Sequence, residues 1–174
     1  MDEIEIVEYD GHWPSMFDEE AALLRQALDG DLVVGVEHFG STAIPGMAAK
    51  PIIDILVGVR SLVEARAVVI EPLQRLGYVF WADNPKTDRM FFVKGMPPYG
   101  VRRTHHVHIT EPAGEMWSRL AFRDYLTARP DEAQRYERLK RDLAAIHRAD
   151  REAYTDAKAA FVEEILDKAK RGRA

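Results

Sequence analysis

The sequence predicts an α/β protein built on a mixed β-sheet. Short runs of β-branched and apolar residues, which are typical of buried strands, occur up to Thr110 and are separated by polar turns or by segments of helical periodicity. Beyond Pro112 the apolar residues recur at helical spacing, so we expect three C-terminal helices packed as a block on the sheet. The expected strands lie near 33–39, 52–58, 78–82, 88–94 and 102–110.

Local signals place the remaining elements. The weak alternation of Ile4 to Tyr9 predicts a short edge strand. Pro14 suits the first turn of a helix, because its missing N–H needs no partner there. Ser61 and Glu64 form a capping box that opens a second helix. The expected helices run over 14–29, 61–76, 115–127, about 131–147 and about 150–170.

Composition limits the class of protein. The 174 residues are expected to form one domain over 1–174. The sequence has no cysteine, which fits a cytoplasmic location and removes thiolate chemistry. The net charge of −5 argues against broad nucleic-acid binding. No apolar run approaches the roughly 18 residues that span a bilayer, and the acidic start Met1-Asp2-Glu3 is not a signal peptide, so no membrane association is expected.

The segment 33–57 carries the first candidate site. Gly40, Ser41 and Thr42 form a polar turn after a strand, and such a turn can offer backbone N–H groups and a hydroxyl to a phosphate. Asp54 interrupts an otherwise apolar strand, where an ionised carboxylate needs a cation, a metal or several N–H donors. A lone buried Asp can equally cap a loop, so this segment alone leaves a structural role open.

Histidines near the last strand form the second candidate feature. On a strand, His106 and His108 point to one face and lie about 7 Å apart, so they can share a metal or bracket a phosphate. A purely structural, hydrogen-bonded role is the alternative. His38, which precedes the Gly-Ser turn, could converge on the same pocket.

The Gly-Ser turn does not match a Walker phosphate loop. The spacing from Gly40 to Gly46 is one residue too long, and Met47 stands where lysine is required. A strand, a Gly-Ser turn, a spacer and a carboxylate on an apolar strand instead resemble the nucleotidyltransferase superfamily. That resemblance implies triphosphate binding at the turn and two metal ions held by paired carboxylates. Asp54 matches one carboxylate, but Leu56 stands in place of the second.

Longer motifs extend over nearly the whole chain. They are Trp13-Pro14 with Phe17, the segments 37–46, 49–54, 103–108 and 122–126, and Tyr154 with Lys158 and Phe161. These motifs resemble the GrpB family, and this resemblance implies a nucleotidyltransferase-like fold. Related domains fused to dephospho-CoA kinase imply a nucleotide or coenzyme A setting, by association. Arg123 could contact a carboxylate or a ligand phosphate, and Tyr154 with Lys158 could donate to an anion. The structural alternatives are an Arg123–Asp124 pair that fixes the helix, and a solvated Lys158 beside a buried Tyr154.

Two functions from different classes remain open. The first is a metal-dependent nucleotidyl or phosphoryl transferase that acts on a small nucleotide-like or coenzyme A-related substrate. The second is a non-catalytic nucleotide-binding or regulatory module of the same fold, so enzymatic activity is left undecided. A third, a zinc hydrolase, lacks an HExxH-like motif.

The candidate site residues follow from the first of these functions. With Leu56 in place of a carboxylate, at most one divalent ion is expected, with zinc or manganese favoured over magnesium. The candidates are Asp54, His106 and His108 for catalysis and metal binding, Gly40, Ser41, Thr42, Lys50 and Arg103 for phosphate, and His38, Glu37, Arg123, Tyr154 and Lys158 as further pocket residues.

Overall fold

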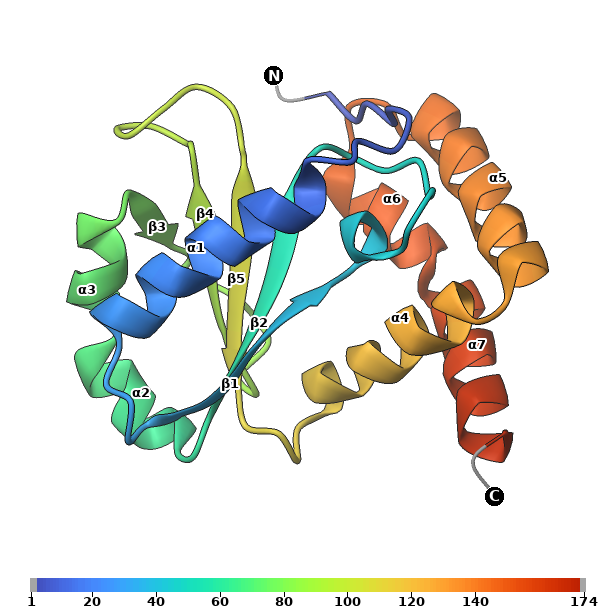
Figure 1. Ribbon diagram of the computed structural model, residues 1–174. Helices are drawn as coiled ribbons and strands as arrows, with labels where there is room; N and C mark the ends of the chain where they lie inside the picture. The colour runs from blue at the N-terminus through green and yellow to red at the C-terminus, as the bar shows by residue number, and fades with distance from the viewer. Residues whose placement is uncertain (1–2, 173–174) are drawn as a thin grey trace.

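A computed structural model describes residues 3–172, and these form a mixed five-stranded sheet with the strand order β1-β2-β5-β4-β3 (Figure 1). The β2–β5 pair is parallel, and the other neighbouring pairs are antiparallel. The strands are β1 (Val33–Phe39), β2 (Ile53–Val59), β3 (Tyr78–Phe80), β4 (Met90–Lys94) and β5 (His105–Thr110). The predicted mixed α/β fold is confirmed.

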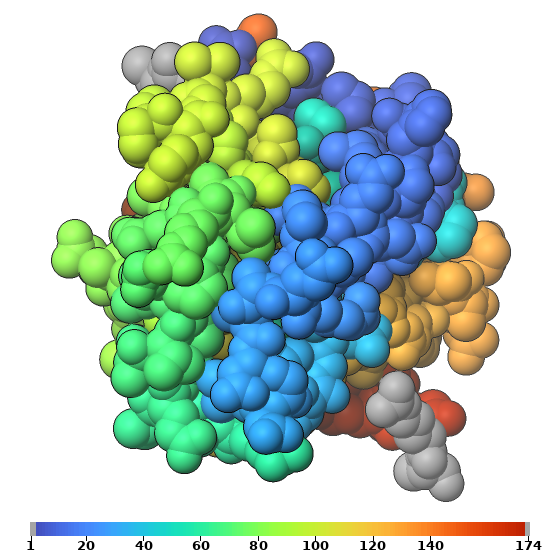
Figure 2. Space-filling view, turned by 60° about the vertical axis from the view of Figure 1, so that its left-hand side comes forward, coloured from blue at the N-terminus to red at the C-terminus, as the bar shows by residue number. Residues whose placement is uncertain are grey.

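Helices cover both faces of the sheet. Helices α1 (Trp13–Ala27), α2 (Leu62–Val68) and α3 (Ile70–Arg75) form one layer, visible side by side in Figure 2. The 3-10 turn η2 (Glu115–Ser118) and α4 (Arg119–Thr127) lie on the other face. Packed around α4 and the 3-10 turn η1 (Ser41–Ala43) are α5 (Pro130–Ile146), α6 (Arg151–Ala157) and α7 (Ala159–Arg171) (Figure 1). Within residues 3–172, no helix combines the length and apolar character needed to cross a membrane.

Side chains along β2 point alternately to the two faces of the sheet, and this alternation decides which of them lie in the main core between the sheet and α1–α3. Ile53, Ile55 and Val57 point toward the α1–α3 layer and have essentially no exposed surface. Each such side chain contributes about 1.5–3 kcal/mol when it is fully buried. Because side chains alternate along a strand, Asp54 and Leu56 must point to the opposite face, toward η2 and α4.

Two expected helices are wrong in extent, because each is interrupted. The helix expected over 61–76 divides into α2 and α3 at Val69. Pro72 explains the break, since it cannot donate to the carbonyl of Val68 and its ring would clash with that group. The helix expected over 150–170 divides into α6 and α7 at Lys158. No glycine or proline stands at that break, and nothing in the local sequence explains it.

The expected edge strand over Ile4 to Tyr9 is also wrong. Only Val7 makes a β-bridge there, to Ala49, while the N–H of Ile4 donates to the carbonyl of Arg148. The segment therefore lies between the loop before β2 and the C-terminal helices, where no strand offers a continuous ladder.

The indole of Trp117 packs on two glycines of the sheet. A Cβ atom at Gly58 would lie 2.8 Å from the Trp117 ring, and one at Gly35 would lie 3.4 Å from it. The close approach of η2 to β1 and β2 therefore requires a bare backbone at Gly58.

We expect Gly58→Ala to lower the free energy of unfolding by about 1–3 kcal/mol, because the new methyl group overpacks against Trp117. Urea denaturation measures the change. Gly11→Ala is the matched control, since nothing lies within 4 Å of a Cβ at Gly11. Equal stability of the two variants would contradict the packing argument.

Candidate functional site

Asp54 and His106 form a hydrogen-bonded pair across the parallel strands. The register of β2 with β5 places the two residues directly opposite each other, and Asp54 Oδ1 lies 3.0 Å from His106 Nδ1. Burial opposes ionisation of Asp54, but the hydrogen bond and charge of His106 hold the pKa of the carboxyl below its ordinary value. The Asp54 side chain keeps 30% of its surface exposed, against 12% for His106. Asp54 is therefore the member of the pair that reaches solvent.

His108 lies on the same face, two residues further along β5. Its ring packs against Phe39 and Phe91, at centroid distances of 5.5 and 4.6 Å. Burial lowers the pKa of His108 to about 3, so the imidazole is neutral at physiological pH. His106 Nε2 and His108 Nδ1 are buried and have no hydrogen-bond partner within residues 3–172. Such orphaned atoms are uncommon in a purely structural cluster.

The Gly40 turn lies directly against the Asp54 carboxylate. Gly40 adopts a φ of 71°, and a Cβ there would lie 2.6 Å from Asp54 Oδ2. Only glycine permits this approach without displacing the carboxylate. A hydrogen bond joins Ser41 to the phenol of Tyr136 on α5, which links the turn to the C-terminal helices.

Thr42 and His38 face away from Asp54. The Thr42 hydroxyl donates to the carbonyl of Ile52 and lies 3.0 Å from His38 Nε2. The ring of His38 stacks on Phe17 of α1, on the other side of the sheet. Burial lowers the pKa of His38 to about 4. The structure therefore does not bring His38 to the side of the sheet that carries Asp54, because His38 pairs with Ile55 and its side chain points to the same face as that residue.

Lysines gather on the opposite wall of the site. Lys158 Nζ lies 4.1 Å from the centroid of the Tyr154 ring, and Lys50 Nζ lies 5.1 Å from the same centroid. Burial lowers the pKa of Lys158 to about 7, and the charges of Lys50, Lys140 and Arg119 act in the same direction. The negative charge of Asp54 acts in the opposite direction and raises the pKa of Lys158.

Lys140 is the most deeply buried of these lysines. Its side chain has 2% exposed surface, lies over the ring of Tyr136 and donates to the carbonyl of Ala48. Burial lowers its pKa to about 7 as well. We name Lys50, Lys140, Lys158 and Arg119 the cation cluster; its members come from the loop before β2, from α5, from the α6–α7 junction and from the start of α4.

Sequence reasoning missed Tyr136, Lys140 and Arg119. A signal for two of them exists, because Tyr136 and Lys140 repeat the spacing of Tyr154 and Lys158, and in each pair the ammonium lies over the ring. Residues four apart share one helix face. Arg119 carries no comparable pattern.

Two predicted pocket residues form a structural clamp instead of facing the cation cluster. Arg123 Nη1 donates to Glu37 Oε2 at 3.2 Å and to the carbonyl of His38 at 2.7 Å, which ties α4 to β1. Arg123 also pairs with Asp124, as the structural alternative expected. Arg103 lies in the loop that leads into β5.

The side chains of the site do not form a complete metal-binding set. Within residues 3–172, no group of three or more His, Asp or Glu residues is placed to hold a metal ion. Asp54 Oδ1 already shares a hydrogen bond with His106. The divalent ion predicted from the sequence stays a prediction, and its binding would need further ligands from outside the protein.

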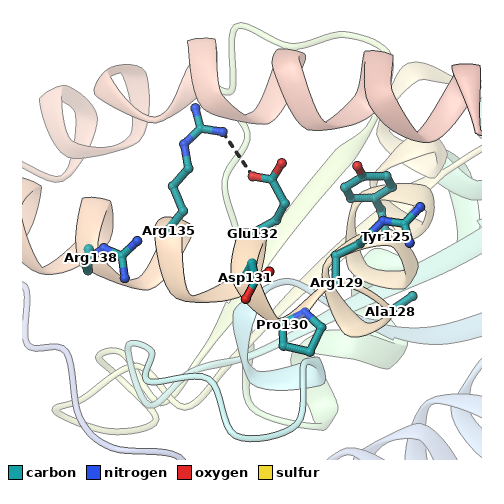
Figure 3. A pocket seen from close by; sticks show the side chains of 8 residues that line it. All are labelled: Tyr125, Ala128, Arg129, Pro130, Asp131, Glu132, Arg135 and Arg138. Carbon is teal, nitrogen blue, oxygen red and sulfur yellow. Dashed lines mark hydrogen bonds and ion pairs between the residues drawn. The ribbon is translucent and has the colours of Figure 1, made fainter.

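A hollow of about 460 Å³ lies elsewhere, at the junction of α4 and α5 (Figure 3). Arg135 pairs with Glu132, as Figure 3 shows, and also with Glu164, so carboxylates already match its charge. The hollow contains none of the predicted site residues. It is lined by Tyr125, Ala128, Arg129, Pro130, Asp131, Glu132, Arg135 and Arg138.

The mixed sheet, the Gly-Ser turn against a strand carboxylate and the C-terminal helical block define a protein with a nucleotidyltransferase-like fold. The chain belongs to the GrpB protein family, which matches residues 3–168. It is 48% identical to the UPF0157 protein PA4798 of Pseudomonas aeruginosa, over 97% of this chain and 68% of that protein. It is 39% identical to the glutamate-rich protein GrpB of Alkalihalophilus pseudofirmus, over 95% of each.

Structural comparison agrees with the family. The crystal structure of the conserved protein GrpB from Enterococcus faecalis has a TM-score of 0.85 and 37% identity, and covers 97% of this chain and 99% of that one. A dephospho-CoA kinase of Mycolicibacterium paratuberculosis is 32% identical over 89% of this chain, which corresponds to 43% of the kinase. The predicted association with dephospho-CoA kinase is therefore present among the relatives.

We expect Lys158→Met to raise the free energy of unfolding at pH 7 by roughly 1–3 kcal/mol, because it removes a poorly solvated charge and keeps the stem. The pKa of Lys158 is lower in the folded state than its ordinary value of 10.5, so the protonated lysine destabilises the fold. That penalty is fully present below about pH 7 and disappears as the pH rises toward 10.5.

Urea denaturation at pH 6.5, 8 and 9.5 (roughly the window of the shift) measures this difference, which should shrink as the pH rises. Lys170→Met on the exposed end of α7 is the matched control, and we expect no comparable trend there. A Lys158→Met protein that is less stable than the wild type at each pH would contradict the assigned burial penalty.

Proposed function

We propose that the chain binds a small, multiply charged phosphate ligand between the sheet and its C-terminal helices, and transfers a nucleotidyl or phosphoryl group from it. The carrying observation is that the ammonium groups of Lys158 and Lys50 lie over one buried ring, that of Tyr154, at 4.1 and 5.1 Å from its centroid, and that the charge of Lys50 acts on the poorly solvated Lys158. A folded protein gains nothing from crowding like charges, so a ligand that neutralises them is the simplest account. The dephospho-CoA kinase relative supports a nucleotide or coenzyme A-related ligand.

The cation cluster and the Gly40 turn would share the binding of the phosphates. Lys50 and Lys158 lie near Asp54, and Lys140 and Arg119 extend the positive charge toward the helices. The turn would contribute backbone N–H groups and the Ser41 hydroxyl. Thr42 would contribute through its backbone alone, because its side chain is bonded to Ile52.

Asp54 is the proposed proton acceptor. Its exposed carboxylate can accept a hydrogen bond from an attacking hydroxyl, and the N–H of His106 would hold it in place. As the new O–P bond forms and the bond to the leaving phosphate breaks, the hydroxyl proton passes to Asp54, the role that an aspartate has in protein kinases. His106 is a positioning residue in this scheme, since its Nε2 is buried.

A metal ion would reach this site only together with the phosphate ligand. A divalent ion carried in by the phosphates would meet Asp54, and oxygens of the ligand would complete its coordination. We assign no step of the reaction to such an ion, because the site offers no three-residue set for it.

A non-catalytic binding module is the second candidate, and one observation favours it. Leu56, which occupies the place of the second carboxylate, is completely buried and packs with Phe39 and Met116. The sheet position that holds an acidic group in two-metal enzymes is here part of an apolar cluster. A module of this kind would keep the cation cluster and bind phosphates without turnover.

Substitutions separate binding from transfer. We expect Lys158→Met and Lys50→Met each to weaken ATP binding about tenfold, because one charge pair in a partly buried site is worth about 1–2 kcal/mol. Asp54→Asn should keep ATP binding, since it removes a negative charge, and lower phosphoryl transfer by about 100-fold or more. Titration calorimetry and detection of released diphosphate or phosphate measure the two effects.

Lys170→Met is again the matched control, with binding and transfer unchanged. Binding of ATP by the wild type without turnover on any hydroxyl acceptor would favour the non-catalytic module. If neither ATP nor inorganic triphosphate binds the wild type, the proposed function is wrong.

Anion binding should depend on pH in the direction that the lysines set. Lys140 and Lys158, with pKa values of about 7, lose their protons as the pH rises, so their attraction for an anion falls. With sulfate, whose own charge stays constant, we expect the affinity to fall several-fold between about pH 6 and pH 8.5. Calorimetry measures the profile, and Lys158→Met should flatten it. An affinity that rises with pH would contradict the cationic site.

A further inference from the structure

A second hollow, of about 340 Å³, lies where α2 meets the loop between β3 and β4, and we call it the Trp81 hollow. Its volume falls within the range of small-molecule pockets, about 300–1,000 Å³. It shares no residue with the cation cluster or with Asp54. The hollow is lined by Arg66, Phe80, Trp81, Ala82, Asn84, Lys86, Thr87 and Arg89.

Trp81 presents an open aromatic surface to this hollow. Its side chain is 44% exposed, although its backbone N–H is bonded to the carbonyl of Phe91 and its position is therefore fixed. One edge of the indole packs against the ring of Phe91, at a centroid distance of 5.7 Å and an interplanar angle of 64°. A fixed, half-exposed indole can stack on a planar ring at little cost in conformational entropy.

Three cationic residues line the hollow together with Trp81. The guanidinium of Arg66 donates to the carbonyls of Thr87 and Arg89, which holds the loop, and both acceptors are neutral. Arg89 contacts the sulfur of Met116, and its nearest carboxylate oxygen, on Asp88, is 3.9 Å away. The side chain of Lys86 is exposed. Asp83 and Asp88 belong to the same loop, so three cations meet two carboxylates.

Asn84 adds an oriented amide. Its Oδ1 accepts a hydrogen bond from the backbone N–H of Lys86, so its amide nitrogen remains available as a donor. An aromatic face, an amide donor and an excess of positive charge are the groups that recognise a heteroaromatic ring joined to a phosphate.

From these contacts we infer that the Trp81 hollow binds a nucleoside monophosphate-like ligand, with its ring on Trp81 and its phosphate near Lys86 and Arg66. The hollow has room for one ring and its phosphate, and the net charge of −5 disfavours a long nucleic-acid strand. This inference does not rest on the proposed function.

Phe91 separates the hollow from the candidate site. Its ring contacts Trp81 on one side and the rings of His106 and His108 on the other, at 5.1 and 4.6 Å. Trp81→Leu should therefore act on monophosphate binding and Lys158→Met on ATP binding, so that a failure of this inference and a failure of the proposed function can be told apart.

The test uses adenosine monophosphate and uridine monophosphate as probes on the full chain. We expect binding to quench the tryptophan fluorescence, because Trp81 is more exposed than Trp13, which is 2% exposed. In calorimetry, Trp81→Leu should weaken binding about tenfold or more, and Trp81→Phe should restore part of it. Lys86→Gln should weaken binding several-fold, and adenosine should bind more weakly than its monophosphate.

Tyr99→Leu is the matched control, since Tyr99 is an exposed aromatic residue outside the hollow, at 54% exposure. Lys170→Met, on the exposed end of α7, should leave monophosphate binding unchanged. Equal binding by Trp81→Leu and the wild type would overturn the inference. So would a failure of both monophosphates to bind the wild type, or inorganic phosphate that binds as tightly as the monophosphates do.

Discussion

The parallel pairing of β2 with β5 is the constraint on which the candidate site depends. In this register Asp54 lies opposite His106, while Ile55 lies opposite Val107 in the main core. A slip of one residue would move Asp54 among the apolar side chains beneath α1 and turn Ile55 toward the opposite face of the sheet, which η2 and α4 cover. The burial of the isoleucines and valines therefore fixes the chemistry of the opposite face, because the core accepts one register only.

The candidate site works against the stability that the core provides. Burial and mutual repulsion lower the pKa of Lys140 and Lys158. His106 and His108 each have one buried imidazole nitrogen without a hydrogen-bond partner in the described part of the chain. Each such feature costs free energy on folding, and none improves packing. These costs are concentrated at one place, beside Gly40, which fits closely against the Asp54 carboxylate. Such a concentration is typical of a binding site.

Much of the fold could be predicted from the sequence, because strand and helix periods are local. The apolar run around Asp54 and the alternation of His106 with Val107 were enough to place these residues on a shared sheet. The break before Pro72 was readable from proline chemistry, whereas the break at Lys158 has no local signal. The cation cluster could not be assembled from the sequence, since tertiary packing alone brings Lys50 beside Lys140 and Lys158. Only the repeated Tyr-Lys spacing pointed toward it.

The origin of the cation cluster has a mechanical consequence. Lys50 belongs to the loop before β2, whereas Lys140 and Lys158 belong to helices that follow the completed sheet. Repulsion between these ammonium groups pushes the helical block away from the loop. The packing of Ile44 with Tyr136 resists it, as do the hydrogen bonds that join Ala48 of the loop to Lys140 and Glu137 of α5. A bound polyanion would reverse the sign of that force and draw the two parts together. Ligand binding would thereby increase the stability with which the C-terminal helices pack against the loop and the sheet.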